Sequence, residues 1–198
     1  MSRPPLGGFF DGHAPTWDDC QTPGLHEAIG RIFAAASFRP GLRVLDVGAG
    51  TGVLYPHFQA AGAGDYTAVD ISPEMVRQFR AKHPEARILE SDYEQPISFP
   101  GLFDAVMIFN AFPHFRNEET VFRLTHSYLS PGGRLFICHS MNREALNEHH
   151  RNAGGVVSED ILISDERIAG HYRKAGFVSI KVENADCFFS EGTKPPHA

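Results

Sequence analysis

Cysteine and long apolar runs are both scarce in this chain. The three cysteines, Cys20, Cys138 and Cys187, are an odd number, lie far apart and show no CxxC spacing, which argues against a disulfide framework or a cysteine metal site and predicts reduced thiols. No window approaches the roughly 18 apolar residues of a membrane span, and the first eight residues lack the apolar stretch of a signal peptide. We therefore expect a cytoplasmic protein without a membrane partner.

The chain also lacks any run rich in Lys and Arg. Lys and Arg total 18 against 24 Asp and Glu, giving a formal net charge of −6, so nucleic acid is not an expected partner. There is no internal repeat, low-complexity tract or linker, and 42% of the 198 residues are hydrophobic. These features predict one globular domain over residues 1–198, as a monomer or a homodimer.

What the sequence does contain is an alternation of strand-length and helix-length segments. A helix is expected around Leu25, Ile29, Ile32 and Phe33, and caps at Ser72 and Asn117 predict the start of two more helices. Alternating strands and helices predict a parallel sheet covered on both faces. The expected strands are residues 43–47, 66–70, 86–89, 103–109 and 134–139, with 177–183 and 187–190 as a closing antiparallel pair.

The first predicted strand runs into a glycine-rich turn, Gly48-Ala49-Gly50-Thr51-Gly52. Glycines allow a ligand to approach the backbone closely and permit positive φ, while N–H groups of the following helix face the ligand. Eighteen residues after Gly52, Asp70 ends the second strand, where an acidic side chain binds a pair of ribose hydroxyls. The third glycine position of the dinucleotide fingerprint falls on Val53, which disfavours NAD or FAD.

Five motifs in this order resemble the class I S-adenosylmethionine-dependent methyltransferases over roughly residues 40 to 140. They are the segments 46–52, 69–75, 91–93, 103–106 and 129–135. The resemblance implies an α/β fold: a Rossmann-like doubly wound sheet of about seven mostly parallel strands with an antiparallel last strand, helices on both faces and an N-terminal helical arm. Residues 1–40 would form the arm or lid, 41–140 the cofactor-binding core, and 141–190 the substrate-side helices and closing strands.

The same resemblance implies where S-adenosylmethionine binds and S-adenosylhomocysteine is left as product. Gly48 and Gly50 would approach its methionine part, with Asp46 orienting the loop and the amino group. Asp70 would bind the ribose. The full expected cofactor-binding set is Asp46, Gly48, Ala49, Gly50, Gly52, Asp70, Ile71, Met75, Asp92, Tyr93 and Asn110. Of these, Ile71 and Met75 would flank the adenine, Asp92 would accept from its amine, and Met75 could equally belong to the helix core.

Methyl transfer requires contact between acceptor and methyl group, and a base only where the acceptor carries a proton. His114, after the fourth strand, is a candidate base or a loop histidine that packs the turn. Arg143, Asn147 and His150 share one helical face, and His139 ends the fifth strand, so these four could form a polar acceptor pocket in which Arg143 binds an acidic group. A solvated helix face is the alternative.

Two further expectations concern the rest of the acceptor site. His139, His149, His150 and Glu148 offer metal-ligand chemistry, although neighbouring histidines on a helix point about 100° apart. The stretch 9–19 is similar to the opening of small-molecule methyltransferases, in which Phe10 and Trp17 would cover the acceptor as a lid.

We therefore expect a methyltransferase that uses S-adenosylmethionine to methylate a small molecule. After Asn110 the sequence departs from the Asn/Asp-Pro-Pro-Tyr/Phe motif of enzymes that methylate nucleobases. The alternatives left open are a non-catalytic protein that binds S-adenosylmethionine or S-adenosylhomocysteine, a metal-assisted methyltransferase using the 139–150 histidines, and a nicotinamide oxidoreductase.

Overall fold

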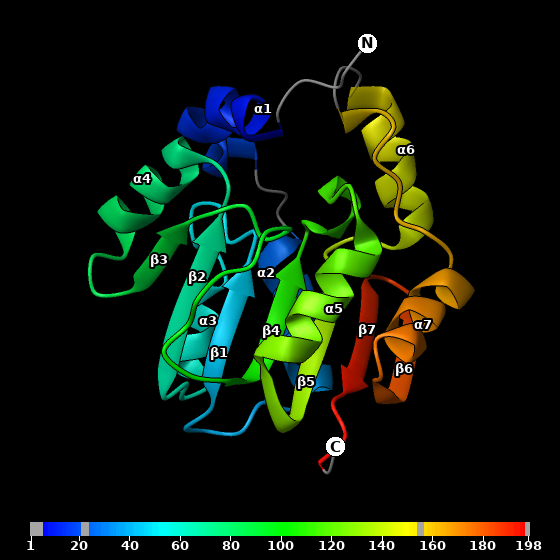
Figure 1. Ribbon diagram of the computed structural model, residues 1–198. Helices are drawn as coiled ribbons and strands as arrows, with labels where there is room; N and C mark the ends of the chain where they lie inside the picture. The colour runs from blue at the N-terminus through cyan, green and yellow to red at the C-terminus, as the bar shows by residue number, and fades with distance from the viewer. Residues whose placement is uncertain (1–5, 21–23, 154–156, 197–198) are drawn as a thin grey trace.

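The structure, a computed structural model, describes residues 6–20, 24–153 and 157–196, which fold around a seven-stranded sheet (Figure 1). The strands lie in the order β3-β2-β1-β4-β5-β7-β6. Their bounds are β1 Arg43–Val47, β2 Asp65–Asp70, β3 Arg87–Glu90, β4 Phe103–Phe109, β5 Leu129–His139, β6 Val178–Asn184 and β7 Phe188–Thr193. Strands β1 to β5 pair in parallel, and β7 runs antiparallel between β5 and β6. The predicted fold class is confirmed.

Helices cover both faces of the sheet because successive strand residues alternate between two apolar clusters. Val44 packs on one face with α2, α3 and α4, and Leu45 packs on the other with α5, α6 and α7. The helices are α1 Leu6–His13, α2 Leu25–Ala36, α3 Tyr55–Ala60, α4 Pro73–Lys82, α5 Glu118–Tyr128, α6 Arg143–Ala153 and α7 Asp165–Lys174, with short 3-10 turns η1 Ala14–Thr16, η2 Asp18–Cys20 and η3 Phe112–His114.

Both predicted helix caps are present. The Ser72 hydroxyl accepts from Met75 N at 3.1 Å and the Asn117 amide oxygen accepts from Thr120 N at 2.9 Å, which satisfies N–H groups that the helix itself leaves unpaired. The fifth strand was expected to begin at Arg134 but begins at Leu129, which pairs with Phe103. A register shift between Phe103 and Ala105 absorbs the extra residues of the strand.

The N-terminal arm lies over the carboxyl-end edge of the sheet, where α1 packs on α4 (Figure 1). The Asp11 carboxylate accepts from the Ser72 hydroxyl at 2.6 Å and from Glu74 N at 3.2 Å, so it adds negative charge to the N-terminus of α4. Asp18 accepts from the Thr51 hydroxyl at 2.7 Å and pairs with Lys82. These contacts fix the arm relative to the glycine loop. Within the described residues, no helix has the length and apolar character needed to cross a membrane.

Candidate functional site

A cleft opens where β1, β2, β3 and β4 end, beneath the N-terminal arm. It contains about 660 Å³ of space that protein atoms do not fill, part of it open to solvent. Its lining combines the glycine loop, the ends of the strands and aromatic side chains of the arm: Phe10, Trp17, Val47, Gly48, Gly50, Val69, Asp70, Ile71, Met75, Ser91, Asp92, Tyr93, Glu94, Asn110, Ala111, His114 and Phe115. Open α/β sheets place their ligands at this edge.

The glycine loop turns between β1 and α3 with positive φ at Gly48 (69°), Gly50 (55°) and Gly52 (96°). A side chain at Gly48 would bring its Cβ within 2.6 Å of the Ala111 Cβ, so glycine is required for the close approach of the two loops. Gly48 and Gly50 line the cleft. Gly52 and Ala49, which were expected beside the ligand, are not among the lining residues; a Cβ at Gly52 would meet Phe79 and His83.

Asp70 ends β2 and holds the glycine loop in place. Its Oδ2 accepts from Gly50 N at 2.7 Å and its Oδ1 accepts from Ser72 N at 2.9 Å, and the side chain lines the cleft. Burial raises the pKa of this carboxyl above its ordinary value, the N–H donors of Ser72, Gly50 and Ile71 oppose that rise, and Asp11 adds to it. Asp70 can therefore receive further hydrogen bonds from a ligand at the edge of the cleft.

Asp46, which was predicted to orient the loop and the amino group of the ligand, is not among the residues that line the cleft. Strand alternation turns its side chain toward the face covered by α3, where its Oδ2 accepts from the Tyr66 hydroxyl at 2.6 Å. The residue is 1% exposed, and burial raises the pKa of its carboxyl to about 7, partly offset by the bond from Tyr66. Asp46 supports the loop from below.

The other predicted cofactor residues share the cleft. Ile71 is 38% exposed, and the Asn110 amide bonds to Ser140, with Asn110 Oδ1 accepting from Ser140 N at 2.9 Å. Asn110 adopts φ of 52°, the left-handed conformation that Asn tolerates better than most residues. The members of the predicted set that line the cleft are Gly48, Gly50, Asp70, Ile71, Met75, Asp92, Tyr93 and Asn110.

Of the predicted catalytic residues, His114 alone lies among those lining the cleft. Its Nδ1 is 2.7 Å from Oδ2 of Asp160, a carboxylate whose side chain is 1% exposed. Asp160 was not predicted, because it lies in the irregular segment before α7, where the sequence has no periodic pattern. Glu94, which lines the cleft together with the predicted Asp70 and Asp92, was also missed; it accepts from the backbone N–H of Arg116 at 3.1 Å and from that of Asn117.

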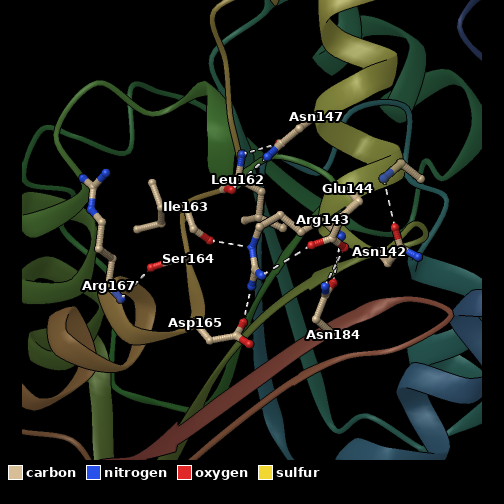
Figure 2. A network of polar contacts seen from close by, with 11 residues as sticks. Asn142, Arg143, Glu144, Asn147, Leu162, Ile163, Ser164, Asp165, Arg167 and Asn184 are labelled. Atoms are coloured by element: carbon tan, nitrogen blue, oxygen red, sulfur yellow. Dashed lines mark hydrogen bonds and ion pairs between the residues drawn. The ribbon is translucent and has the colours of Figure 1, made fainter.

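The polar face of α6, for which an acceptor pocket or a solvated face was predicted, binds a neighbouring segment of the chain (Figure 2). Arg143 Nε donates to Ile163 O at 2.8 Å and its guanidinium pairs with Asp165. The amide of Asn147 accepts from Leu162 N at 2.7 Å and donates to Leu162 O at 3.2 Å.

His150 completes this contact, since its Nδ1 donates to the carbonyl oxygen of Asp160. Arg143, Asn147 and His150 do share one helical face, as predicted. That face is occupied by residues 160–165, which we call the clamped segment. Asp160, Leu162 and Ile163 of this segment are buried outside regular structure, so their backbone groups need hydrogen-bond partners. None of the three residues lines the cleft.

His139 ends β5 but is buried, with 1% of its surface exposed, and lies outside the cleft lining. Burial, with smaller contributions from the nearby His114 and His150, lowers its pKa to about 3, so the ring is neutral. Neither ring nitrogen has a hydrogen-bond partner among the described residues. Within the same residues, no group of three or more His, Cys, Asp or Glu side chains is placed to hold a metal ion, so the metal-assisted alternative finds no support there.

Comparison with known proteins finds a family that matches part of this chain. Residues 44–133 match the family described as methyltransferase domain. The chain is 36% identical over 115 residues to a ubiquinone biosynthesis O-methyltransferase of Xanthomonas campestris pv. campestris (strain B100), a match that covers 56% of this chain and 47% of that protein. The chain thus spans about half the length of this curated relative.

Solved structures share the fold at lower identity. One match is a chain from the complex between the Trm112 methyltransferase activator of Haloferax volcanii and a methyltransferase. Its TM-score is 0.78 and its identity is 19%, and the match covers 98% of this chain and 99% of the matched chain. Phosphoethanolamine N-methyltransferase 2 of Haemonchus contortus, solved with S-adenosyl-L-methionine, matches with a TM-score of 0.71 and 16% identity, over 86% of this chain and 52% of that one.

Asp46→Asn tests the buried carboxyl beneath the loop. Because the folded protein holds this proton up to about pH 7 while the unfolded chain releases it near its ordinary pKa of 3.8, wild-type stability falls as the pH rises through that window. We expect the free energy of unfolding of D46N, relative to wild type, to rise by on the order of 3 kcal/mol between about pH 4 and pH 8. Denaturant unfolding at several pH values measures it. Asp186→Asn, at an exposed position, should show no such trend; a trend equal in both variants would contradict the assignment.

Asn147→Ala tests the clamp. The substitution leaves the buried N–H and C=O of Leu162 without the amide that satisfies both, and we expect a loss of about 2 kcal/mol in urea unfolding. Glu148→Ala, one residue along on the exposed side of α6, should change stability by less than about 0.5 kcal/mol. Equal effects of the two substitutions would show that the amide does not hold the segment.

Proposed function

Since the matched domain and the confirmed fold make this chain a member of the class I S-adenosylmethionine-dependent methyltransferases, we propose that it transfers a methyl group to a small-molecule acceptor bound in the cleft. The observation that carries the proposal is the Asp70 carboxylate, fixed by Gly50 N and Ser72 N at the edge of a cleft formed by strand ends. S-adenosylmethionine supplies the sulfonium methyl group, and the protein binds and orients both reactants.

The lining residues fit the parts of this cofactor. Asp70 accepts from the ribose hydroxyls, a role that an acidic residue after the second strand fills in nucleotide-binding α/β folds. The exposed side chain of Ile71 and the sulfur of Met75 offer apolar contact for the adenine, and Asp92 offers an acceptor for its amine. Gly48 and Gly50 line the cleft without side chains, so their backbone can approach the methionine part closely.

The remaining residues of the predicted set lie around the proposed cofactor site. Asn110 and the backbone of Tyr93 border the cofactor, while Tyr93 itself is anchored through its hydroxyl, 2.9 Å from the Thr125 hydroxyl. Asp46, Ala49 and Gly52 keep the loop in shape without touching the ligand. This arrangement leaves the part of the cleft bounded by Phe10, Trp17 and His114 for the acceptor.

The acceptor is a small molecule on this proposal. The cleft is concave and mostly apolar, with a few polar groups among its lining residues, as is usual for small-molecule sites. Phe10 and Trp17 meet edge to face with ring centres 5.8 Å apart, and together they shield this end of the cleft from water. The similarity to an O-methyltransferase of ubiquinone biosynthesis supports an acceptor of this size.

Calorimetric titration of S-adenosylhomocysteine into wild type and Asp70→Asn tests the cofactor assignment. Losing charge-assisted hydrogen bonds to the ribose costs about 1.5–3 kcal/mol, so D70N should bind roughly 10- to 100-fold more weakly. Asp186→Asn should bind like wild type. Equal affinity in D70N would contradict the ribose site, and binding of NAD without S-adenosylhomocysteine would contradict the family's cofactor in this chain.

A further inference from the structure

The His114–Asp160 ion pair reaches the cleft through His114, which is one of the lining residues. His114 ends η3, just after β4, and its ring meets the Phe10 ring edge to face at 5.1 Å between centres. Nδ1 of His114 and Oδ2 of Asp160 are 2.7 Å apart, with 12% of the histidine side chain exposed. η3 directly follows Ala111, and both Ala111 and His114 line the cleft.

The fold fixes the position of Asp160 through the clamped segment. Asp160 N donates to Val157 O at 3.0 Å, and its carbonyl oxygen accepts from His150 Nδ1. Two residues on, Leu162 is held on both sides by the Asn147 amide, and Arg143 holds Ile163 and Asp165 (Figure 2). The polar face of α6 thus positions the carboxylate instead of binding the acceptor.

A carboxylate against Nδ1 has a defined effect on an imidazole. The carboxylate accepts a hydrogen bond from Nδ1–H and so selects the tautomer in which Nε2 carries the lone pair. It also stabilises the positively charged ring that forms when Nε2 takes a proton. Among the described residues, Phe10 of α1 and His150 of α6 lie against the His114 ring, and His139 of β5 is nearby. Burial lowers the pKa of both of these histidines, which disfavours positive charge beside the ring.

We propose that His114 is the general base of this enzyme and that its acceptor is a hydroxyl group on an aromatic ring. The inference rests on the methyl transfer proposed above. As the hydroxyl oxygen forms a bond to the methyl carbon, the carbon–sulfur bond breaks and its electron pair stays on sulfur. The hydroxyl proton passes to Nε2 of His114, whose proton is later released to water. The products are a methyl ether and S-adenosylhomocysteine.

Two observations select this class of acceptor. A neutral amine already carries a nucleophilic lone pair, whereas a hydroxyl gains its full nucleophilicity when a base takes its proton, so a carboxylate-oriented imidazole is best matched to oxygen. Phe10, Trp17 and Phe115 line the cleft and provide flat apolar surfaces for a ring. No Lys or Arg belongs to the cleft lining among the described residues, which disfavours a phosphate or carboxylate group at this point.

A coloured phenol reports the proton transfer without turnover. The probe is 4-nitrophenol, added to protein saturated with S-adenosylhomocysteine at a pH about one unit below the probe's own pKa, where the free probe is mostly neutral. We expect the bound probe to show the visible band of its anion. In His114→Asn the ratio of ionised to neutral bound probe should fall about tenfold, equivalent to one pKa unit. Asp160→Asn should also lower it, and the exposed His149→Asn should leave it unchanged.

Calorimetry with S-adenosylhomocysteine on the same variants distinguishes failure of the proposed general base from failure of the proposed function. His114→Asn and Asp160→Asn should retain its affinity within about threefold, which also shows that they are folded; His114→Gln is the second variant if the first is unstable. Three results, each with normal S-adenosylhomocysteine binding, would overturn only the general base and the phenolic acceptor. They are a bound probe that stays neutral, a probe that is equally ionised in H114N, and no binding of the probe. Loss of S-adenosylhomocysteine binding in wild type would overturn the proposed function itself.

Discussion

The carboxylate of Asp70 connects the two parts of the sheet edge on which the site depends. One oxygen fixes Gly50 in the loop after β1, and the other fixes Ser72 at the start of α4. Ser72 in turn caps α4 and donates to Asp11 of the arm. The glycine loop, the helix start and the arm over the cleft therefore share one buried anchor. The parallel pairing of Asp46 with Ala68 and of Val47 with Val69 brings the ends of β1 and β2 level, which makes these bonds possible.

Local patterns in the sequence predicted the sheet well, because apolar runs, caps and glycines act over a few residues. The strand at 43–47 and the strand at 103–109 have the predicted bounds, and Ser72 and Asn117 cap their helices. The glycine loop adopts positive φ as its composition indicates. Asp70 reached its predicted place because it directly follows a buried strand, and the ends of parallel strands meet at one edge.

The substrate side was harder to predict because its partners are far apart in sequence. The spacing of Arg143, Asn147 and His150 indicated their common face, but no pattern indicated that residues 160–165 would occupy it. Asp160 was missed for the same reason, since a single carboxylate in an irregular segment gives no periodic signal. Asp46 shows the opposite case: its motif was recognised, yet strand alternation turns it toward Tyr66 and away from the ligand. Motif and orientation are separate pieces of information.

The most direct test of the account is a crystal structure of this protein with S-adenosylhomocysteine bound. The account predicts that the ribose hydroxyls lie within hydrogen-bond distance of the Asp70 carboxylate, that the homocysteine part lies beside Gly48, and that the sulfur faces the space bounded by Phe10 and His114. S-adenosylhomocysteine bound elsewhere, or bound in the cleft with its ribose away from Asp70, would contradict it.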